Sequence, residues 1–217
     1  MDQISPDVAN SWAHRRIVPE QDSASDDRRG DTRHMAVLRV GKIMRGEQEE
    51  LCMIRNISAG GLMAQVQGRY VPADRLRVAV SNNHVLEGVV AWFDGMRMGM
   101  AFDERIDVLD FLANEQATLG GRRPRSPRIR VDVLALMRRG ADYHRVGVID
   151  IAQGGAKLET DVPLVRDEEV VITLRDLPPI TATVRWSDGT HAGIAFHERL
   201  GFEPLAEWIA ERNEERR

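Results

Sequence analysis

The stretches W-F-D-G-M-R-M-G-M-A-F-D-E-R (residues 92–105) and W-S-D-G-T-H-A-G-I-A-F-H-E-R (residues 186–199) match at 8 of 14 positions and lie 94 residues apart. The same offset relates N-I-S-A-G-G-L, residues 56–62, to D-I-A-Q-G-G-A, residues 150–156. Two landmarks that keep one spacing indicate a duplicated domain of about 90 residues, because the repeats of solenoids run to only ~20 to 50 residues. The chain is therefore predicted to contain the same fold twice.

Each half of the chain has the pattern of short strands. Apolar and polar residues alternate around three series: Leu76, Val78, Val80; Ile129, Val131, Val133; and Ile180, Ala182, Val184, Trp186. A period of two with one polar face predicts antiparallel sheet that buries one side. Glycine pairs, Asp-Gly turns and prolines divide each half into about six strands, a number that suits a small barrel or a sandwich.

A helical pattern ends each half. Apolar residues recur at spacings of three and four in residues 105–116 (Ile106, Leu109, Leu112, Ala113) and in residues 202–214 (Phe202, Leu205, Trp208, Ile209). The expected fold is mainly β, with six antiparallel strands and then one helix, twice over.

Domain boundaries are expected where the composition changes. Residues 1–27 have few periodic apolar positions and are predicted to be a flexible arm. Residues 28–117 are predicted to form the first domain and residues 129–217 the second. Between them, residues 118–128 read T-L-G-G-R-R-P-R-S-P-R, which predicts a linker and a basic arm without regular structure.

The composition narrows the class of protein. The chain has 217 residues, of which 42% are hydrophobic and 29% are charged, a balance that suits two small globular domains. No stretch approaches the ~20 consecutive apolar residues of a membrane helix, and the first residues lack the order of a secretory signal. We therefore expect a cytoplasmic protein without membrane insertion. The net charge of -4 argues against DNA or RNA as a partner.

Thiol, metal and catalytic chemistry are not expected. The single cysteine, Cys52, sits in an apolar run and is predicted to pack rather than react. The six histidines show no HxxxH or HExxH spacing, so no metal site is predicted. No nucleophile has a base nearby, and no GxxxxGK[ST] loop is present. The sequence therefore predicts neither an enzyme nor a bound cofactor.

Two short motifs carry the functional prediction. The first, R-R-G-D-T-R-H at residues 28–34, precedes the first strand, and the second, N-I-S-A-G-G at residues 56–61, lies at the turn between the second and third strands. Alone, each motif is better explained by a solvated charge run or a tight turn. Together, and inside a six-stranded unit with a terminal helix, they resemble the PilZ domain family. The signature motifs of that family are RxxxR and [DN]xSxxG, its fold is a barrel, and its ligand is cyclic di-GMP.

The residue types in these motifs suit such a ligand. Guanidinium groups match phosphate oxygens, or the O6 and N7 edge of guanine, in a two-pronged way. An amide and a hydroxyl two residues apart on a strand face the same side, and glycines let a flat base approach the backbone. A tryptophan offers a stacking surface, although tryptophan on a strand is more often part of a core. The resemblance thus implies these ligand-binding residues: Arg28, Arg29, Arg33, Asn56, Ser58, Gly60, Gly61 and Trp92.

The position of Arg28 bears on the number of ligands. In the family, an arginine immediately before RxxxR goes with two mutually stacked cyclic di-GMP molecules, and a non-basic residue there goes with one. Arg28 occupies that place. The resemblance therefore implies an intercalated ligand dimer.

The second copy departs from both motifs. Ala152 replaces the serine of the second motif, and the arm R-R-P-R-S-P-R, residues 122–128, has no two arginines four apart. Counting back from the first strand puts Arg128 in the place of Arg33, whereas the offset of 94 puts Pro127 there, and the sequence leaves both alignments open. Loss of one guanidinium and one hydroxyl costs on the order of 2 to 5 kcal/mol. The second domain is therefore expected not to bind the nucleotide by itself and to serve as scaffold or partner surface.

The predicted function is a cytoplasmic receptor that binds cyclic di-GMP through its first domain and relays binding, as a conformational change, to a downstream protein partner. The alternative is a structural adaptor of tandem barrels that binds protein independently of nucleotide. The sequence leaves open the downstream process, the identity of the partner, the formation of homo-oligomers and any contact between the arginines of residues 122–128 and the ligand.

Overall fold

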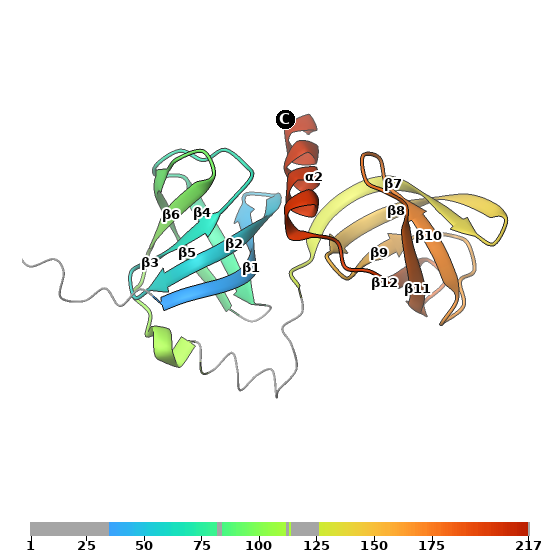
Figure 1. Cartoon of the computed structure of the whole chain (residues 1–217), viewed down its shortest axis with the longest axis horizontal. Coiled ribbons are helices and arrows are strands. Elements are labelled where there is room, and N and C mark those ends of the chain that lie inside the picture. The colour runs from blue at the N-terminus through green and yellow to red at the C-terminus, as the bar shows by residue number, and fades with distance from the viewer. Residues whose placement is uncertain (1–34, 82–83, 112, 114–125, 217) are drawn as a thin grey trace, which may run out of the picture. The chain divides into compact units, whose positions relative to one another are not determined.

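The structure is a computed structural model that describes residues 35–81, 84–111, 113 and 126–216. Within these residues the strands form two closed barrels of six antiparallel strands each. Figure 1 shows the strands of both barrels and the helix at the end of the chain. The predicted fold class, a mainly β chain with two six-stranded barrels each followed by a helix, is confirmed. Thr32–Arg217 cluster as one compact unit.

The first barrel closes in the strand order β1-β2-β3-β6-β5-β4. Its strands are β1 (Met35–Arg45), β2 (Gln48–Ser58), β3 (Gly61–Gln65), β4 (Arg75–Ser81), β5 (His84–Phe93) and β6 (Arg97–Phe102).

The second barrel has the same order of neighbours, β10-β11-β12-β9-β8-β7. Its elements are β7 (Ile129–Arg139), β8 (Asp142–Ala152), β9 (Gly155–Glu159), β10 (Glu169–Thr173), β11 (Ile180–Ser187), β12 (His191–Phe196) and the helix α2 (Phe202–Glu215).

The two barrels correspond residue for residue at the offset of 94. Met35 pairs with Ile57 at the start of the first barrel, and Ile129 pairs with Ile151 at the start of the second. The last rungs also correspond, because Gly88 pairs with Phe102 as Ala182 pairs with Phe196. The duplication inferred from the sequence thus extends, without a shift in register, from the first strand of each barrel to its sixth.

The barrel interiors hold the predicted apolar alternation. Leu76, Val78 and Val80 are 2%, 0% and 3% exposed, and Ile180, Ala182 and Val184 are also buried. Cys52 lies in the first core, fully buried as predicted. Burial raises the pKa of its thiol to about 12.

The alternation fails at Trp186, which the sequence pattern placed with Ile180, Ala182 and Val184. Trp186 is 43% exposed and lies on the outside of the barrel. The register of β11 against β12 shifts between Val184 and Trp186, so Arg185 is an extra residue. Such a bulge reverses which side of the strand the following side chains face.

Helix α2 confirms the prediction for residues 202–214. Leu205, Trp208 and Ile209 are at most 3% exposed and belong to the core cluster of the second barrel. The Trp208 indole Nε1 donates a hydrogen bond to the Arg175 carbonyl at 2.7 Å. This bond anchors the helix to the loop after β10.

The helix predicted for residues 105–116 is described over residues 108–111 and at 113, and the rest of its predicted second half lies outside the described residues. The Asp107 carboxylate starts it by accepting hydrogen bonds from the Leu109 and Asp110 amides. Leu109, expected on the apolar face, is 67% exposed, and Phe111 is buried instead. In the part of the chain that the structure describes, no helix is long and apolar enough to cross a membrane.

Candidate functional site

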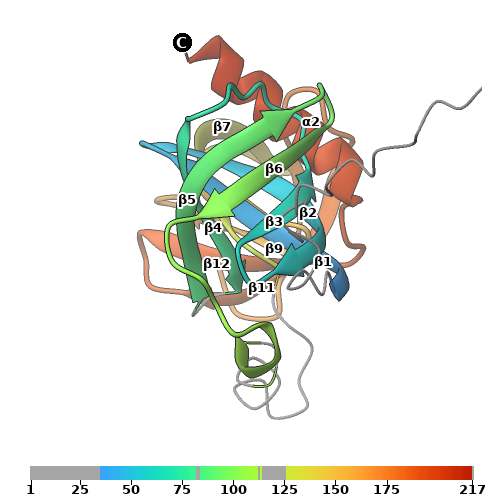
Figure 2. The same cartoon turned by 90° about the vertical axis from the view of Figure 1, so that its left-hand side faces the viewer.

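One row of residues crosses four strands on the outside of the first barrel. Asn56 on β2 pairs with Met63 on β3, Met63 with Gly99 on β6, and Gly99 with Trp92 on β5. Figure 2 shows β3, β6 and β5 side by side. Residues directly opposite each other in an antiparallel ladder lie on the same side of the sheet, so all four residues lie on the outside of the barrel, and the path from Asn56 to Trp92 along its curved surface crosses three strand spacings of about 4.8 Å. The row is thus a surface with a polar end and an aromatic end.

The aromatic end is built from Trp92 and Gly99 together. A Cβ atom on Gly99 would lie 2.1 Å from the indole Nε1 of Trp92 and 2.4 Å from its Cε2. The indole therefore occupies the space above Gly99. Trp92 is nevertheless 42% exposed, so it is an outer-surface residue and not part of the core.

Two bulges turn the ends of this row outward. The register shifts between Ile54 and Asn56 on β2 and between Val90 and Trp92 on β5. Ile54 and Val90 point into the core, and the extra residue after each reverses the alternation. Without these bulges, Asn56 and Trp92 would point inward.

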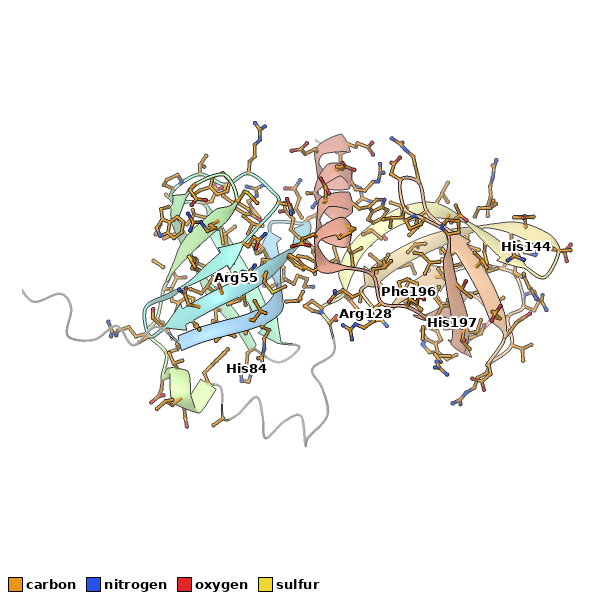
Figure 3. The ribbon with its side chains drawn as sticks, viewed as in Figure 1. Arg55, His84, Arg128, His144, Phe196 and His197 are labelled. Carbon is orange, nitrogen blue, oxygen red and sulfur yellow. The ribbon has the colours of Figure 1, made fainter. Side chains whose placement is uncertain are left out.

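The extra residue on β2 is Arg55, which the sequence interpretation did not single out. Its guanidinium is exposed and donates a hydrogen bond to Gln65 Oε1 at 2.6 Å, and Figure 3 labels Arg55 on β2. The sequence does contain a signal for Arg55, because this residue immediately precedes Asn56, the first residue of the N-I-S-A-G-G motif. Met63, at the centre of the row, was also missed, because only the strand pairing reveals it.

Ser58 and Gly61 hold the turn of the second motif. The Ser58 hydroxyl, 6% exposed, donates to the Gly61 carbonyl at 3.1 Å. A Cβ on Gly61 would lie 2.4 Å from the Met100 carbonyl oxygen, so the close approach of β6 requires glycine there. Gly60 is exposed, and a Cβ built on it would meet no atom within 4 Å.

The three arginines of the first motif, Arg28, Arg29 and Arg33, lie outside the described residues. The structure describes the chain from Met35 onward, and Ala36 on β1 pairs with Asn56. The start of β1 therefore runs beside the polar end of the row.

The second barrel repeats the row with different chemistry. Asp150 pairs with Lys157, Lys157 with Gly193 and Gly193 with Trp186. A Cβ on Gly193 would lie 2.0 Å from the indole Nε1 of Trp186, so the aromatic end is preserved. Lys157, however, stands where the first barrel has Met63. The centre of the row is thus charged in the second barrel and apolar in the first.

The polar end of the second row is occupied by the protein itself. Arg128 NH1 donates to Asp150 Oδ1 at 2.5 Å, and Figure 3 labels Arg128 just before β7. Because Ile129 takes the place of Met35 in the ladder, the offset of 94 is the alignment that the strand register supports. Pro127 thus takes the place of Arg33, and Arg128 that of the next residue.

A hydrogen-bonded chain fastens the segment before β7 to the second barrel. Arg199 NH2 donates to Ser126 Oγ at 2.5 Å, and Ser126 Oγ donates to Gln153 Oε1 at 3.2 Å. Gln153 Nε2 in turn donates to the Leu200 carbonyl at 3.0 Å. Together with the ion pair of Arg128, these bonds hold residues 126–128 against the mouth of the barrel.

Two barrels that share one strand order, one register and one outer row define a tandem-barrel protein. The model of the PilZ domain matches residues 27–114 and again residues 122–207. The chain therefore belongs to the PilZ domain family, through both halves. Members of this family are receptors and effectors, not enzymes. Among the described residues, no group of three or more His, Cys, Asp or Glu side chains is arranged to hold a metal ion.

Several solved structures resemble the chain at low identity. PlzA of Borreliella burgdorferi, solved in complex with c-di-GMP, is 14% identical with a TM-score of 0.37, over 84% of this chain and 94% of that one. The Bacillus subtilis inhibitor of motility (MotI/DgrA) is 14% identical with a TM-score of 0.32, over 82% and 96%. YcgR of Escherichia coli, in complex with c-di-GMP, is 11% identical with a TM-score of 0.29, over 82% of each chain. A comparison with curated protein sequences gave no match.

Proposed function

We propose that the first barrel is a receptor site for cyclic di-GMP, on the outer row that runs from Asn56 to Trp92. The observation that carries the proposal is the strand pairing, which joins Asn56 to Trp92 along the outside of the barrel and pairs Asn56 with Ala36, three residues after Arg33 in the sequence. Membership of the PilZ family and the two motifs support it. Because cyclic di-GMP is a bacterial second messenger, the receptor acts in the cytoplasm.

Each residue of the row has a chemical role in this proposal. The exposed face of the Trp92 indole stacks on a guanine or on the ring of a neighbouring ligand group. The Asn56 amide meets the polar edge of a base, since it can both donate and accept. Arg29 and Arg33 bind phosphate oxygens or the guanine O6 and N7 edge in a bidentate way. Gly60 leaves the surface beside them clear.

Ser58 and Gly61 act on the ligand through the turn that they shape. The hydroxyl of Ser58 already donates to the Gly61 carbonyl, so it is available to a ligand as an acceptor only. Arg28 is proposed to admit a second cyclic di-GMP molecule stacked on the first. The proposed stoichiometry is thus two ligands per chain.

The second barrel is proposed not to bind the nucleotide and to serve as a scaffold or partner surface. Its row offers Lys157 in place of Met63, and its Asp150 carboxylate is paired with Arg128. Ala152 lacks the hydroxyl that shapes the first turn, and Pro127 lacks a guanidinium. Binding at the first barrel is proposed to be relayed to a downstream protein partner, because a ligand that binds one conformation of the chain better than another shifts the population toward that conformation.

Isothermal titration of the whole chain with cyclic di-GMP tests the proposal. We expect Arg33→Ala to weaken binding by about 10- to 150-fold, the equivalent of one lost charged hydrogen bond of about 1.5 to 3 kcal/mol. Arg128→Ala in the second barrel is the matched control and is expected to leave the affinity unchanged. Arg28→Ala is expected to reduce the stoichiometry from two ligands to one.

The competing function is a tandem-barrel adaptor that binds protein independently of nucleotide. It predicts no heat of binding in the wild-type titration. Hydrogen exchange provides a second readout, since the receptor proposal requires slower exchange of the amides of residues 28–33 at saturating ligand. Absence of heat together with unchanged exchange would overturn the receptor proposal in favour of the adaptor.

A further inference from the structure

The outer face of the β7–β8 hairpin carries three exposed apolar side chains that the ligand proposal does not use. Leu134, Leu136 and Tyr143 are 76%, 40% and 63% exposed. The two leucines alternate along β7 with buried residues and so point outward. Tyr143 faces the same side, because its ladder partner is Arg138, the next outward residue of β7. Figure 3 labels His144, the neighbour of Tyr143 in this hairpin.

No described residue covers these three side chains, and the ladder partners of the two leucines explain why. Leu134 lies opposite Gly147, which has no side chain, and the nearest side chain beyond Gly147 is that of Glu159 on β9, whose Oε2 lies 3.4 Å from the point where a Cβ on Gly147 would stand. Leu136 lies opposite Arg145, whose own side chain is exposed. An exposed apolar strip of this kind, rimmed by polar groups, is typical of an interaction surface. We call Leu134, Leu136 and Tyr143, with Arg138 and Arg145, the hairpin face.

The same face of the first barrel shows what such a surface binds. At the offset of 94, Val40 takes the place of Leu134 and Leu51 that of Arg145. Leu51 is only 2% exposed, and both residues join the core cluster that contains the apolar side of α2. Strand β2 contacts α2 directly. An amphipathic helix therefore covers on the first barrel the face that the second barrel leaves open.

A polar contact fixes this helix on the first barrel as well. The Asn213 side chain on α2 donates a hydrogen bond from Nδ2 to the Glu49 carbonyl at 3.0 Å. Glu49 is the residue that corresponds to Tyr143. Both partners belong to the compact unit Thr32–Arg217. The face of the first barrel that α2 covers and the hairpin face of the second barrel are thus equivalent positions of the same fold.

The charged residues of the hairpin face indicate which kind of helix it would bind. Arg138 and Arg145 are exposed, and among the described residues no carboxylate forms an ion pair with either. The helix that covers the first barrel is acidic along its exposed side, which carries Glu203, Glu207, Glu211, Glu214 and Glu215. A helix with apolar residues in the middle and carboxylates at the rim complements two leucines, a tyrosine and two arginines.

We propose that the hairpin face is a docking surface for an acidic amphipathic α-helix of a partner protein. This inference deepens the proposed role of the second barrel as a partner surface, but it requires no nucleotide. Its test is therefore run without cyclic di-GMP, so that its failure and the failure of the receptor proposal are distinguishable.

The test uses a fluorescent peptide with the sequence of residues 202–216, an acidic amphipathic helix of known composition, and follows its polarisation as the whole chain is added. We expect a Kd tighter than about 1 mM for the wild type and weaker binding by about tenfold or more for Leu134→Lys. Val165→Lys is the matched control, because Val165 is a 64% exposed apolar residue of the same barrel outside the hairpin face. It is expected to bind the peptide as the wild type does.

Two further measurements decide the kind of partner. A peptide in which lysine replaces the five glutamates is expected to bind more weakly, and equal binding would overturn the acidic helix as the occupant. Sedimentation equilibrium of the wild type and Leu134→Lys tests for a second copy of the chain. A dimer that Leu134→Lys abolishes would assign the face to self-association and overturn the proposal, as would peptide binding that Leu134→Lys leaves unchanged.

Discussion

The indole nitrogen of Trp92 lies 2.1 Å from the point where a Cβ atom on Gly99 would stand. The two residues are ladder partners on neighbouring strands, and the aromatic surface of one exists only because the other has no side chain. Trp186 and Gly193 repeat the relationship at 2.0 Å. This pairing explains why tryptophan and the second glycine recur together in both halves of the sequence.

Gly99→Ala is expected to displace the Trp92 indole and to weaken cyclic di-GMP binding by about 2- to 13-fold, because a stacking contact is worth about 0.5 to 1.5 kcal/mol beyond its buried area. Gly193→Ala makes the same clash in the second barrel and is expected to leave the affinity unchanged. Titration calorimetry measures both variants, with circular dichroism to verify that each is folded. Equal affinities for Gly99→Ala and the wild type would remove Trp92 from the binding site.

Gly61→Ala is expected to lower the free energy of unfolding by about 1 to 3 kcal/mol, the usual cost of overpacking. The new methyl group would meet the Met100 carbonyl oxygen at 2.4 Å, and a backbone atom inside a ladder cannot move aside alone. Gly60→Ala is the control, since its methyl group meets no atom within 4 Å. Urea denaturation separates the two, and a Gly61→Ala variant as stable as Gly60→Ala would contradict the close approach of β6.

The fold was predictable because duplication and alternation are local properties of the sequence. The offset of 94 appears in two short motifs, and the strand register keeps it. The bulges were not predictable, because an extra residue in a strand is defined only by its partner strand, so Trp186 was placed on the wrong side. The ion pair of Arg128 with Asp150 was missed for the same reason, since the two residues are 22 positions apart in sequence.

Asp188→Ala is expected to lower the melting temperature at neutral pH and to lose this effect in acid. Backbone hydrogen bonds from His191 and Thr190 to the Asp188 carboxylate hold its pKa below the usual value. A carboxyl with a lower pKa in the folded state stabilises the fold above its unfolded pKa of about 3.9, and this stabilisation disappears as the pH falls through the folded pKa. Melting curves of both proteins between about pH 7 and pH 2 provide the measurement. A difference that stays constant down to the lowest pH would contradict the assignment.

Asp94 provides the matched position in the first barrel. Backbone hydrogen bonds from Arg97 and Met96, and the Arg97 guanidinium, likewise hold the pKa of its carboxyl low. Asp94→Ala is therefore expected to show the same convergence with the wild type at acid pH. Measured carboxyl pKa values at or above the unfolded value in either hairpin would contradict the turn geometry.

Cys52 is expected to be inert in the folded protein. It is fully buried and burial raises its pKa to about 12, so almost none of it is thiolate at pH 8. Reaction with a disulfide reagent at pH 8 should proceed only as fast as the first barrel opens and should accelerate sharply in denaturing urea. Rapid reaction in the absence of denaturant would show that the core around Cys52 is accessible.

Equal spacing in the two barrels creates a hazard for folding, because the hairpin β5–β6 matches the hairpin β11–β12 in register. Exchange of such elements between repeats is a common form of misfolding. The packing of the cores disfavours such an exchange. In the first barrel the small Ala64 on β3 pairs with the large Met98 on β6, whereas in the second the large Leu158 on β9 pairs with the small Ala192 on β12. All four are fully buried.

A swapped hairpin would set Met98 against Leu158 and Ala192 against Ala64, overfilling one barrel and leaving a void in the other. Both errors are destabilising. Because the small and the large residue exchange places between the two barrels, each hairpin packs well only in its own barrel.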